Sequence, residues 1–168
     1  MIDQTTLNRI KLLHPKLITE VEGIYLNEIV PALESDTYCR FAYTLRNFAE
    51  QDALYAQGRT KLFDNAGNRL GVVTNAKGGQ SYHNYGLALD IVLISGVTAS
   101  WDTAKDFDED GTPDWMEIVE IFQNHGWTWG ESWGDKPHFE KTFGNHWSTL
   151  LDKYNQKDFI PGTMYINI

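Results

Sequence analysis

Two residues that can bind metal, His83 and Asp90, lie seven positions apart in the stretch S-Y-H-N-Y-G-L-A-L-D. Asp90 stands inside the apolar run 87–94, where an unpaired buried carboxylate would be very costly. Three explanations of Asp90 stay open: it caps a turn at a strand end, it pairs with a basic residue, or it binds a metal. An odd spacing places two side chains on opposite faces of a straight strand, but Gly86 can supply a bend that brings both to one point.

A second cluster, W-G-D-K-P-H-F-E, occupies residues 133–140. His138 follows Pro137, which favours extended backbone, so His138 and Glu140 are expected to share one face of a strand. Asp135 precedes His138 by three residues and is expected in a loop. The alternative is an ordinary turn, in which Asp135 and Pro137 are turn formers and His138 is incidental.

Together the two clusters supply two imidazoles and one carboxylate, from His83, His138 and Asp90. Three protein ligands and one open position are typical of a catalytic zinc site, whereas structural zinc sites usually have four protein ligands. The remaining carboxylate, Asp135, could take a proton from water and pass it to a leaving amine. The predicted chemistry is the attack of metal-activated water on an amide carbonyl.

The motifs S-x-H-x-x-G-x-A-x-D at 81–90 and D-x-P-H-F-E at 135–140 occur in this order. They resemble the zinc-dependent D-alanyl-D-alanine carboxypeptidase and L-alanyl-D-glutamate endopeptidase family, which includes phage endolysins. The resemblance extends over about residues 40–145, including 45–60 and 115–130. It implies an α+β fold shared with the amino-terminal signalling domain of Hedgehog proteins, with helices packed on a small antiparallel sheet. We expect residues 1–168 to form a single zinc peptidase domain.

The resemblance also assigns roles to individual residues. The zinc ligands of the family match His83, Asp90 and His138. Its catalytic acid/base matches Asp135, and two of its substrate contacts match Arg46 and Ser81. The guanidinium of Arg46 would stabilise an oxyanion or hold a substrate carboxylate. Three more residues match a helix of the family but are equally well explained as structural cap and surface residues: Gln51, Gln57 and Arg59.

The implied function is a zinc metallopeptidase that hydrolyses an amide bond of peptidoglycan stem peptides. An endolysin-type L-alanyl-D-glutamate endopeptidase is expected first. Two alternatives stay open: a D-alanyl-D-alanine carboxypeptidase on the same scaffold, and a non-catalytic cell-wall-binding module stabilised by zinc. The presence of Asp135 weighs against the binding module, because a pure binder needs no such base.

A separate acidic loop fits the calcium pattern D-x-D-x-D-G-x5-E, with Gly111 at the sixth position. The residues at its ligand positions are Asp106, Asp108, Asp110, Thr112, Asp114 and Glu117. An acidic turn without calcium stays open as the alternative, because Asp114 and Glu117 also fit a capping box for the next helix. No clear helix precedes the loop, and Pro113 replaces the usual apolar eighth residue.

The chain has 168 residues and a formal charge of −9, which suits one acidic domain. The acidity argues against general binding to nucleic acid or anionic membranes. Cys39 is the only cysteine, so an internal disulfide and a cysteine-rich zinc site are excluded, and Cys39 is expected to be buried. No secretion signal is predicted at the N-terminus. We expect a monomer that stays cytoplasmic until it is released to act on the cell wall.

The expected elements are a helical first third and a mixed remainder. Helices are predicted at 7–13, from 15 to just before Pro31, at 47–58, at 115–125 after a cap at Asp114, and at 147–154. Strands are predicted at 87–94, 127–129 and 138–140, and a loop is predicted at 61–80. One of Trp127, Trp129 and Trp133 is expected to be exposed near the site. The remaining histidines, His14, His125 and His146, are not expected to bind metal.

Overall fold

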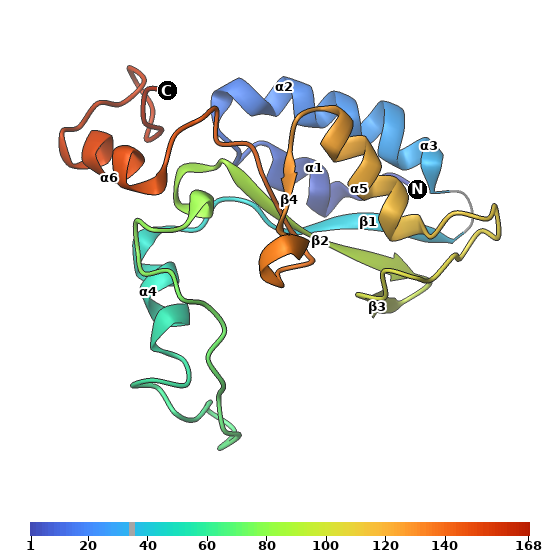
Figure 1. Cartoon of the computed structure of the whole chain (residues 1–168), viewed down its shortest axis with the longest axis horizontal. Helices are drawn as coiled ribbons and strands as arrows, with labels where there is room; N and C mark the ends of the chain where they lie inside the picture. The colour runs from blue at the N-terminus through green and yellow to red at the C-terminus, as the bar shows by residue number, and fades with distance from the viewer. Residues whose placement is uncertain (34–35) are drawn as a thin grey trace. The chain divides into compact units, whose positions relative to one another are not determined.

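The structure is a computed structural model that describes residues 1–33 and 36–168 (Figure 1). The chain forms two compact units, and each consists of two separate stretches of sequence. The first unit comprises residues 1–45 and 87–141, and the second comprises residues 46–86 and 142–168. None of the helices in these described stretches has the length and apolar character needed to cross a membrane.

The first unit contains a five-stranded antiparallel sheet. Its main strand order is β1 (Thr37–Tyr43), β2 (Ala88–Ser95), β5 (His138–Glu140) and β4 (Thr128–Trp129). A short strand, β3 (Thr98–Ser100), also pairs with β2, along residues 93–95. Residues of β2 on both faces are buried, which explains why the sequence 87–94 is almost continuously apolar.

The helices at the start of the first unit and the helix before β4 lie on one side of this sheet (Figure 1). They are α1 (Gln4–Ile10), α2 (Pro15–Ile24), a π-helical turn η1 (Tyr25–Ile29), α3 (Val30–Ala32) and α5 (Asp114–Asn124). Aromatic rings from these helices and from the sheet meet in the core, where Phe122 packs against Phe41, Trp127 and Phe139. Cys39 is buried as predicted, and burial raises the pKa of its thiol.

The prediction that the second helix ends before Pro31 is wrong. The helical backbone continues through η1, where the Val30 N–H donates to the Tyr25 carbonyl, and Pro31 then lies in the first turn of α3. Pro31 has no N–H to donate to the preceding turn, and the helix ends one residue later, at Ala32.

The first third of the chain is also not wholly helical, because it includes the unpredicted strand β1. The residues of β1 alternate between buried and half-buried, with Thr37, Cys39 and Phe41 facing the core. The alternation is weak in the sequence, because Tyr38 and Ala42 on the opposite face are also apolar or aromatic. The partner that makes this segment a strand, β2, lies about fifty residues later in the chain.

The second unit contains α4 (Phe48–Ala56), a 3-10 turn η2 (Tyr82–Tyr85) and α6 (Trp147–Asn155). The predicted capping box at the start of α4 is confirmed: the Asn47 side chain accepts from the Glu50 N–H, and the Glu50 carboxylate accepts from the Asn47 N–H. The ring of Phe48 packs against Tyr85 and Tyr154 and so joins the three helical elements.

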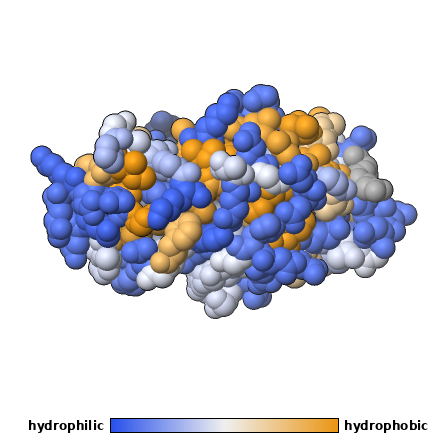
Figure 2. All heavy atoms as spheres, turned by 90° about the horizontal axis from the view of Figure 1, so that it is seen from above, coloured by the Kyte–Doolittle hydropathy of each residue, from blue (hydrophilic) through white to orange (hydrophobic). Residues whose placement is uncertain are grey.

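Residues 61–80 form the predicted loop, with one isolated antiparallel bridge between Phe63 and Arg69. The face of the molecule shown in Figure 2 is largely hydrophilic, with hydrophobic residues gathered in several patches between the polar ones. This surface agrees with the formal charge of −9 and with apolar side chains concentrated in the core.

The start of α1 is fixed to β1 through the buried carboxylate of Asp3. Asp3 caps α1 by accepting from Thr6, and it accepts two hydrogen bonds from Arg40 at 2.9 and 3.0 Å. The hydroxyl of Thr6 accepts in turn from the Phe41 N–H. Burial raises the pKa of Asp3, but the hydrogen bonds from Arg40 and Thr6 outweigh burial, so its pKa lies below its usual value.

We predict that Asp3→Asn lowers the free energy of unfolding at pH 7 by about 1–2 kcal/mol, because the amide keeps the cap but loses the charged pair. A lowered carboxyl pKa stabilises the fold above pH 3.8, and this contribution disappears as the pH falls through the folded-state pKa. Urea denaturation of both proteins between pH 7 and pH 3 measures the difference. An equal difference at every pH would contradict the ionic contribution.

Candidate active site

Asp90 and His138 face each other across two paired strands. They are direct partners in the antiparallel register of β2 and β5, and the Ile91 N–H donates to the Pro137 carbonyl beside them. Directly opposite residues project to the same face of a sheet, so the imidazole Nδ1 of His138 lies 3.3 Å from Oδ1 of Asp90. The next residue, Phe139, points to the other face and is fully buried in the core, which fixes the orientation of β5.

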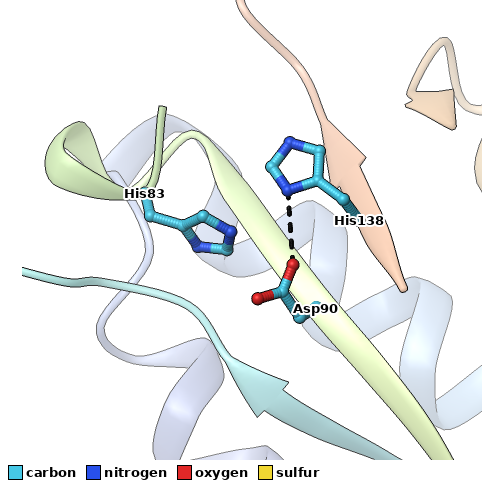
Figure 3. Close-up of side chains that lie close together, drawn as sticks. All are labelled: His83, Asp90 and His138. Atoms are coloured by element: carbon cyan, nitrogen blue, oxygen red, sulfur yellow. Dashed lines mark hydrogen bonds and ion pairs between the residues drawn. The ribbon is translucent and has the colours of Figure 1, made fainter. Parts of the chain in front are cut away.

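His83 precedes β2 on the short turn η2. The turn begins with a reciprocal cap between Ser81 and Asn84 and ends at Gly86, whose φ of +68° lies in the left-handed region. Gly86 therefore supplies the predicted bend before the buried strand. One ligand atom from each of His83, Asp90 and His138 lies within 4.8 Å of the others (Figure 3).

The chemistry of this group fits a zinc ion. In a tetrahedral site with bonds of about 2.0–2.1 Å, two donor atoms lie about 3.4 Å apart. The 3.3 Å between His138 Nδ1 and Asp90 Oδ1 agrees with that separation. His83 and His138 are buried, whereas Asp90 is half-buried, so the donors are sheltered without being sealed from solvent. Two nitrogens and one carboxylate oxygen match the ligand count of a catalytic zinc site.

Glu140 holds the second ring nitrogen of His138. Its Oε2 lies 3.0 Å from His138 Nε2, while Nδ1 faces Asp90. Burial lowers the pKa of His138, but hydrogen bonds with Asp90 and Glu140 outweigh burial and raise it to about 9. The two carboxylates thus favour positive charge at the ring. A carboxylate on the nitrogen opposite the metal is a common way to fix the tautomer of a histidine ligand.

This role of Glu140 was missed at the level of sequence, although a signal was present. Glu140 lies two residues after His138 and was expected on the same face of a strand. A carboxylate at that spacing from a histidine ligand can reach the far ring nitrogen.

Asp135 lies in the exposed turn between η3 (Gly130–Trp133) and β5. Its N–H donates to the Gly130 carbonyl, and its own carbonyl accepts from the His138 N–H at 3.1 Å. A Cβ on Gly130 would approach the Asp135 carbonyl to 2.4 Å, so this close turn requires glycine. The turn ties the backbone of Asp135 directly to a candidate ligand.

One of the three tryptophans is exposed near the site, as expected. Trp133 is 52% exposed, and its ring centroid lies 6.1 Å from that of His138. Trp127 is buried, and the indole of Trp129 donates to the Lys136 carbonyl.

Arg46 and Ser81 lie beside His83 in the second unit. The Arg46 N–H donates to the His83 carbonyl, and the Arg46 carbonyl accepts from Asn84. The Arg46 guanidinium donates to Gln51, which is 1% exposed and in turn donates to the Ala76 carbonyl. Gln51 therefore has a structural role, as in one of the two alternatives, but it is buried rather than on the surface, and its amide joins α4 to the following loop.

The other two residues of the matched helix have structural contacts. Arg59 donates to the Tyr55 and Thr74 carbonyls and stacks 4.0 Å from the Tyr55 ring centroid. Gln57 ends α4, with its N–H donating to the Leu54 carbonyl.

The remaining histidines have other contacts among the described residues. His14 and His146 cap α2 and α6 through Nδ1, and His125 Nε2 lies 2.7 Å from Glu28 Oε1.

The acidic loop brings Asp106, Asp108 and Asp114 together, with one oxygen from each within 4.8 Å of the others. The predicted capping box at Asp114 is wrong: α5 begins at Asp114 itself, its N-cap is Pro113, and no side chain caps it. Pro113 enters the helix in extended backbone, which leaves the Asp114 carboxylate in the first turn rather than at the cap. Burial, followed by repulsion from Asp110 and Asp108, raises the pKa of Glu117 to about 7.

The contact between Glu140 and His138 makes a prediction about metal affinity. Glu140→Ala should weaken zinc binding by about 10–100-fold, because His138 loses the acceptor that fixes its ring. Glu140→Gln keeps an acceptor at that position and should recover most of the affinity. Competition with a chromophoric zinc chelator measures both variants. Equal affinity in Glu140→Ala and the wild type would show that the contact does not position the ligand.

Part of the chain is similar to known peptidases. Residues 74–141 match a family model described as D-alanyl-D-alanine carboxypeptidase. The peptidoglycan L-alanyl-D-glutamate endopeptidase CwlK of Bacillus subtilis is 48% identical over 99 residues, which cover 56% of this chain and 55% of CwlK. The chain thus spans about half the length of this curated relative.

A structural likeness supports the fold. The crystal structure of ChiX, an L-Ala D-Glu endopeptidase of Serratia marcescens, matches with a TM-score of 0.52 at 20% identity, covering 84% of this chain and 90% of ChiX. This match confirms the predicted α+β fold with helices packed on a small antiparallel sheet. The matched segment 74–141 carries all three candidate ligands and is similar to the D-alanyl-D-alanine carboxypeptidase family model.

Proposed function

We propose that this protein is a zinc peptidase that cleaves the L-alanyl-D-glutamate bond in peptidoglycan stem peptides. The observation that carries the proposal is the convergence of His83, Asp90 and His138, with ligand atoms within 4.8 Å, in a segment that matches a peptidase family. The choice of bond rests on CwlK, an endopeptidase named for it, which is 48% identical over the aligned residues.

The metal would be held by His83, Asp90 and His138. A zinc ion with three protein ligands supplies Lewis acidity, which polarises a carbonyl and lowers the pKa of water. Asp135 takes the proton from the attacking water and passes it to the leaving amine, and so acts first as base and then as acid. Asp135 is exposed in the turn before β5, which suits a group that meets water and substrate.

Arg46 and Ser81 serve as substrate contacts in this proposal. The guanidinium of Arg46 is held by buried Gln51, and such an anchored cation is suited to a stem-peptide carboxylate or to the oxyanion of the reaction. The Ser81 hydroxyl lies at the start of η2, two residues before His83, and donates or accepts according to the peptide group it meets. Trp133 offers an exposed aromatic surface beside His138.

The family model is described as a carboxypeptidase, which favours a second candidate, release of terminal D-alanine. Digestion of purified muropeptides followed by mass spectrometry separates the two activities. We expect free amino termini at D-glutamate and no loss of single alanine residues. Release of D-alanine alone would assign the carboxypeptidase activity instead. No change in any muropeptide by the zinc-loaded protein would leave the wall-binding module as the function.

The role of Asp135 is tested separately from metal binding. Asp135→Asn should lower the rate of hydrolysis by about 10²–10⁴-fold, because the amide cannot take up the proton. Its zinc content should stay near one per chain, since Asp135 is not a ligand. Glu131→Gln, an exposed acid on η3, is the matched control and should keep full activity. Full activity in Asp135→Asn would remove Asp135 from the mechanism.

A monomeric state, action as a released endolysin and a single domain across residues 1–168 stay predictions. Sedimentation of the purified protein tests the first of these.

A further inference from the structure

A second group of potential metal ligands lies in the acidic loop (residues 106–117), which leads into α5. Carboxylate oxygens of Asp106, Asp108 and Asp114 lie within 4.8 Å of one another. Three carboxylates at this separation repel each other unless a cation lies between them. An acidic cluster alone does not make a site, because acids in a solvated loop can simply be screened by water and salt.

The buried carboxylate of Asp114 distinguishes this loop from a solvated acidic turn. Asp114 is 0% exposed, and its Oδ2 accepts from the Phe107 N–H at 2.7 Å. Its Oδ1 is buried and has no hydrogen-bond partner among the described residues. A buried carboxylate oxygen without a partner is strongly unfavourable, so a ligand is expected to satisfy it.

Glu117, one helical turn after Asp114, also has a buried carboxylate oxygen. Its Oε2 is likewise buried and without a hydrogen-bond partner in the described part of the chain. Residues three apart on a helix lie on the same face, so Glu117 and Asp114 project from the first turn of α5 in a common direction. Helix capping does not explain either carboxylate, because α5 has no side-chain cap and the Asp114 N–H donates to the Lys105 carbonyl.

Hydrogen bonds from backbone N–H groups to acidic side chains shape the rest of the loop. Asp106 accepts from the N–H groups of Glu109 and Gly111, and Gly111 has a φ of +102°, which only glycine adopts readily. Asp110 accepts from the Thr112 N–H and remains exposed. The backbone of the loop thus turns before the helix begins, with Asp106 and Asp108 half-buried and Asp110 exposed.

We propose that the acidic loop binds one calcium ion through Asp106, Asp108, Asp114 and Glu117, with Asp110 and the Thr112 carbonyl completing the shell. All of these donors are oxygens, which favours a hard cation over zinc. Six donors spaced along one loop suit calcium, whose coordination is larger and more flexible than that of magnesium. The ion neutralises the clustered acids and stabilises the start of α5.

Calcium titration of the zinc-loaded protein, followed by calorimetry and by thermal unfolding, tests this site. We expect one calcium per chain and a rise in Tm of roughly 5–10 °C at a hundredfold excess over Kd. Magnesium at the same concentration should produce a much smaller rise. No heat of binding and no shift in Tm at 5 mM calcium would overturn the proposal.

Two variants and one control assign the binding to this loop. Asp108→Asn and Glu117→Gln should each abolish the calcium-dependent shift or weaken binding at least tenfold. Glu109→Gln makes the same change of charge in the same loop, but Glu109 is exposed and outside the ligand set, so it should respond like the wild type. An undiminished response in Asp108→Asn and Glu117→Gln would place calcium elsewhere.

Glu117→Gln also distinguishes a ligand from a structural acid. Without calcium this variant should be at least as stable as the wild type, because it removes a buried charge from a cluster of like charges. With calcium it should become the less stable of the two. A Glu117→Gln protein that is less stable to the same extent with and without calcium would show a purely structural role. The test does not depend on the peptidase activity, since binding is measured directly.

Discussion

The candidate active site depends on the register between β2 and β5. This pairing places Asp90 opposite His138, and a shift of one residue would turn His138 into the core and Phe139 toward the site. Burial of Phe139 prevents that shift, because its ring packs against Phe122 in the interior of the first unit. The hydrophobic core thus determines which side chains meet around the metal.

The costly feature in the sequence, a carboxylate within a buried strand, is explained by this arrangement. Asp90 lies where β2 pairs with the ligand-bearing end of β5, so its charge is shared with a histidine and with the proposed cation. Glu140 contacts the other ring nitrogen of His138 and so fixes the orientation of the imidazole. In the acidic loop, the carboxylate of Asp114 is also buried, and the proposed cation would again compensate its charge.

Much of the fold followed from local signals, since Pro15, the Asn47–Glu50 capping box and the apolar run 87–94 each specify an element without help from distant residues. The strand β1 did not follow from local signals, because its alternation is weak and the segment is a strand only through its pairing with β2. The π-helical turn before Pro31 and the start of α5 at Asp114 also differed from the predicted boundaries. For the site, residue types and the glycine bend were sufficient to group His83, Asp90 and His138. The contacts of Gln51 required the positions of its partners, whereas the spacing of Glu140 from His138 already carried a signal.

The central claim is that one zinc ion joins His83, Asp90 and His138. Anomalous diffraction from crystals of the zinc-loaded protein, recorded on both sides of the zinc absorption edge, tests it most directly. We expect a single strong peak about 2.0–2.2 Å from one atom of each of the three side chains. A zinc peak bound by other residues, or no peak at this position in the fully loaded protein, would contradict it.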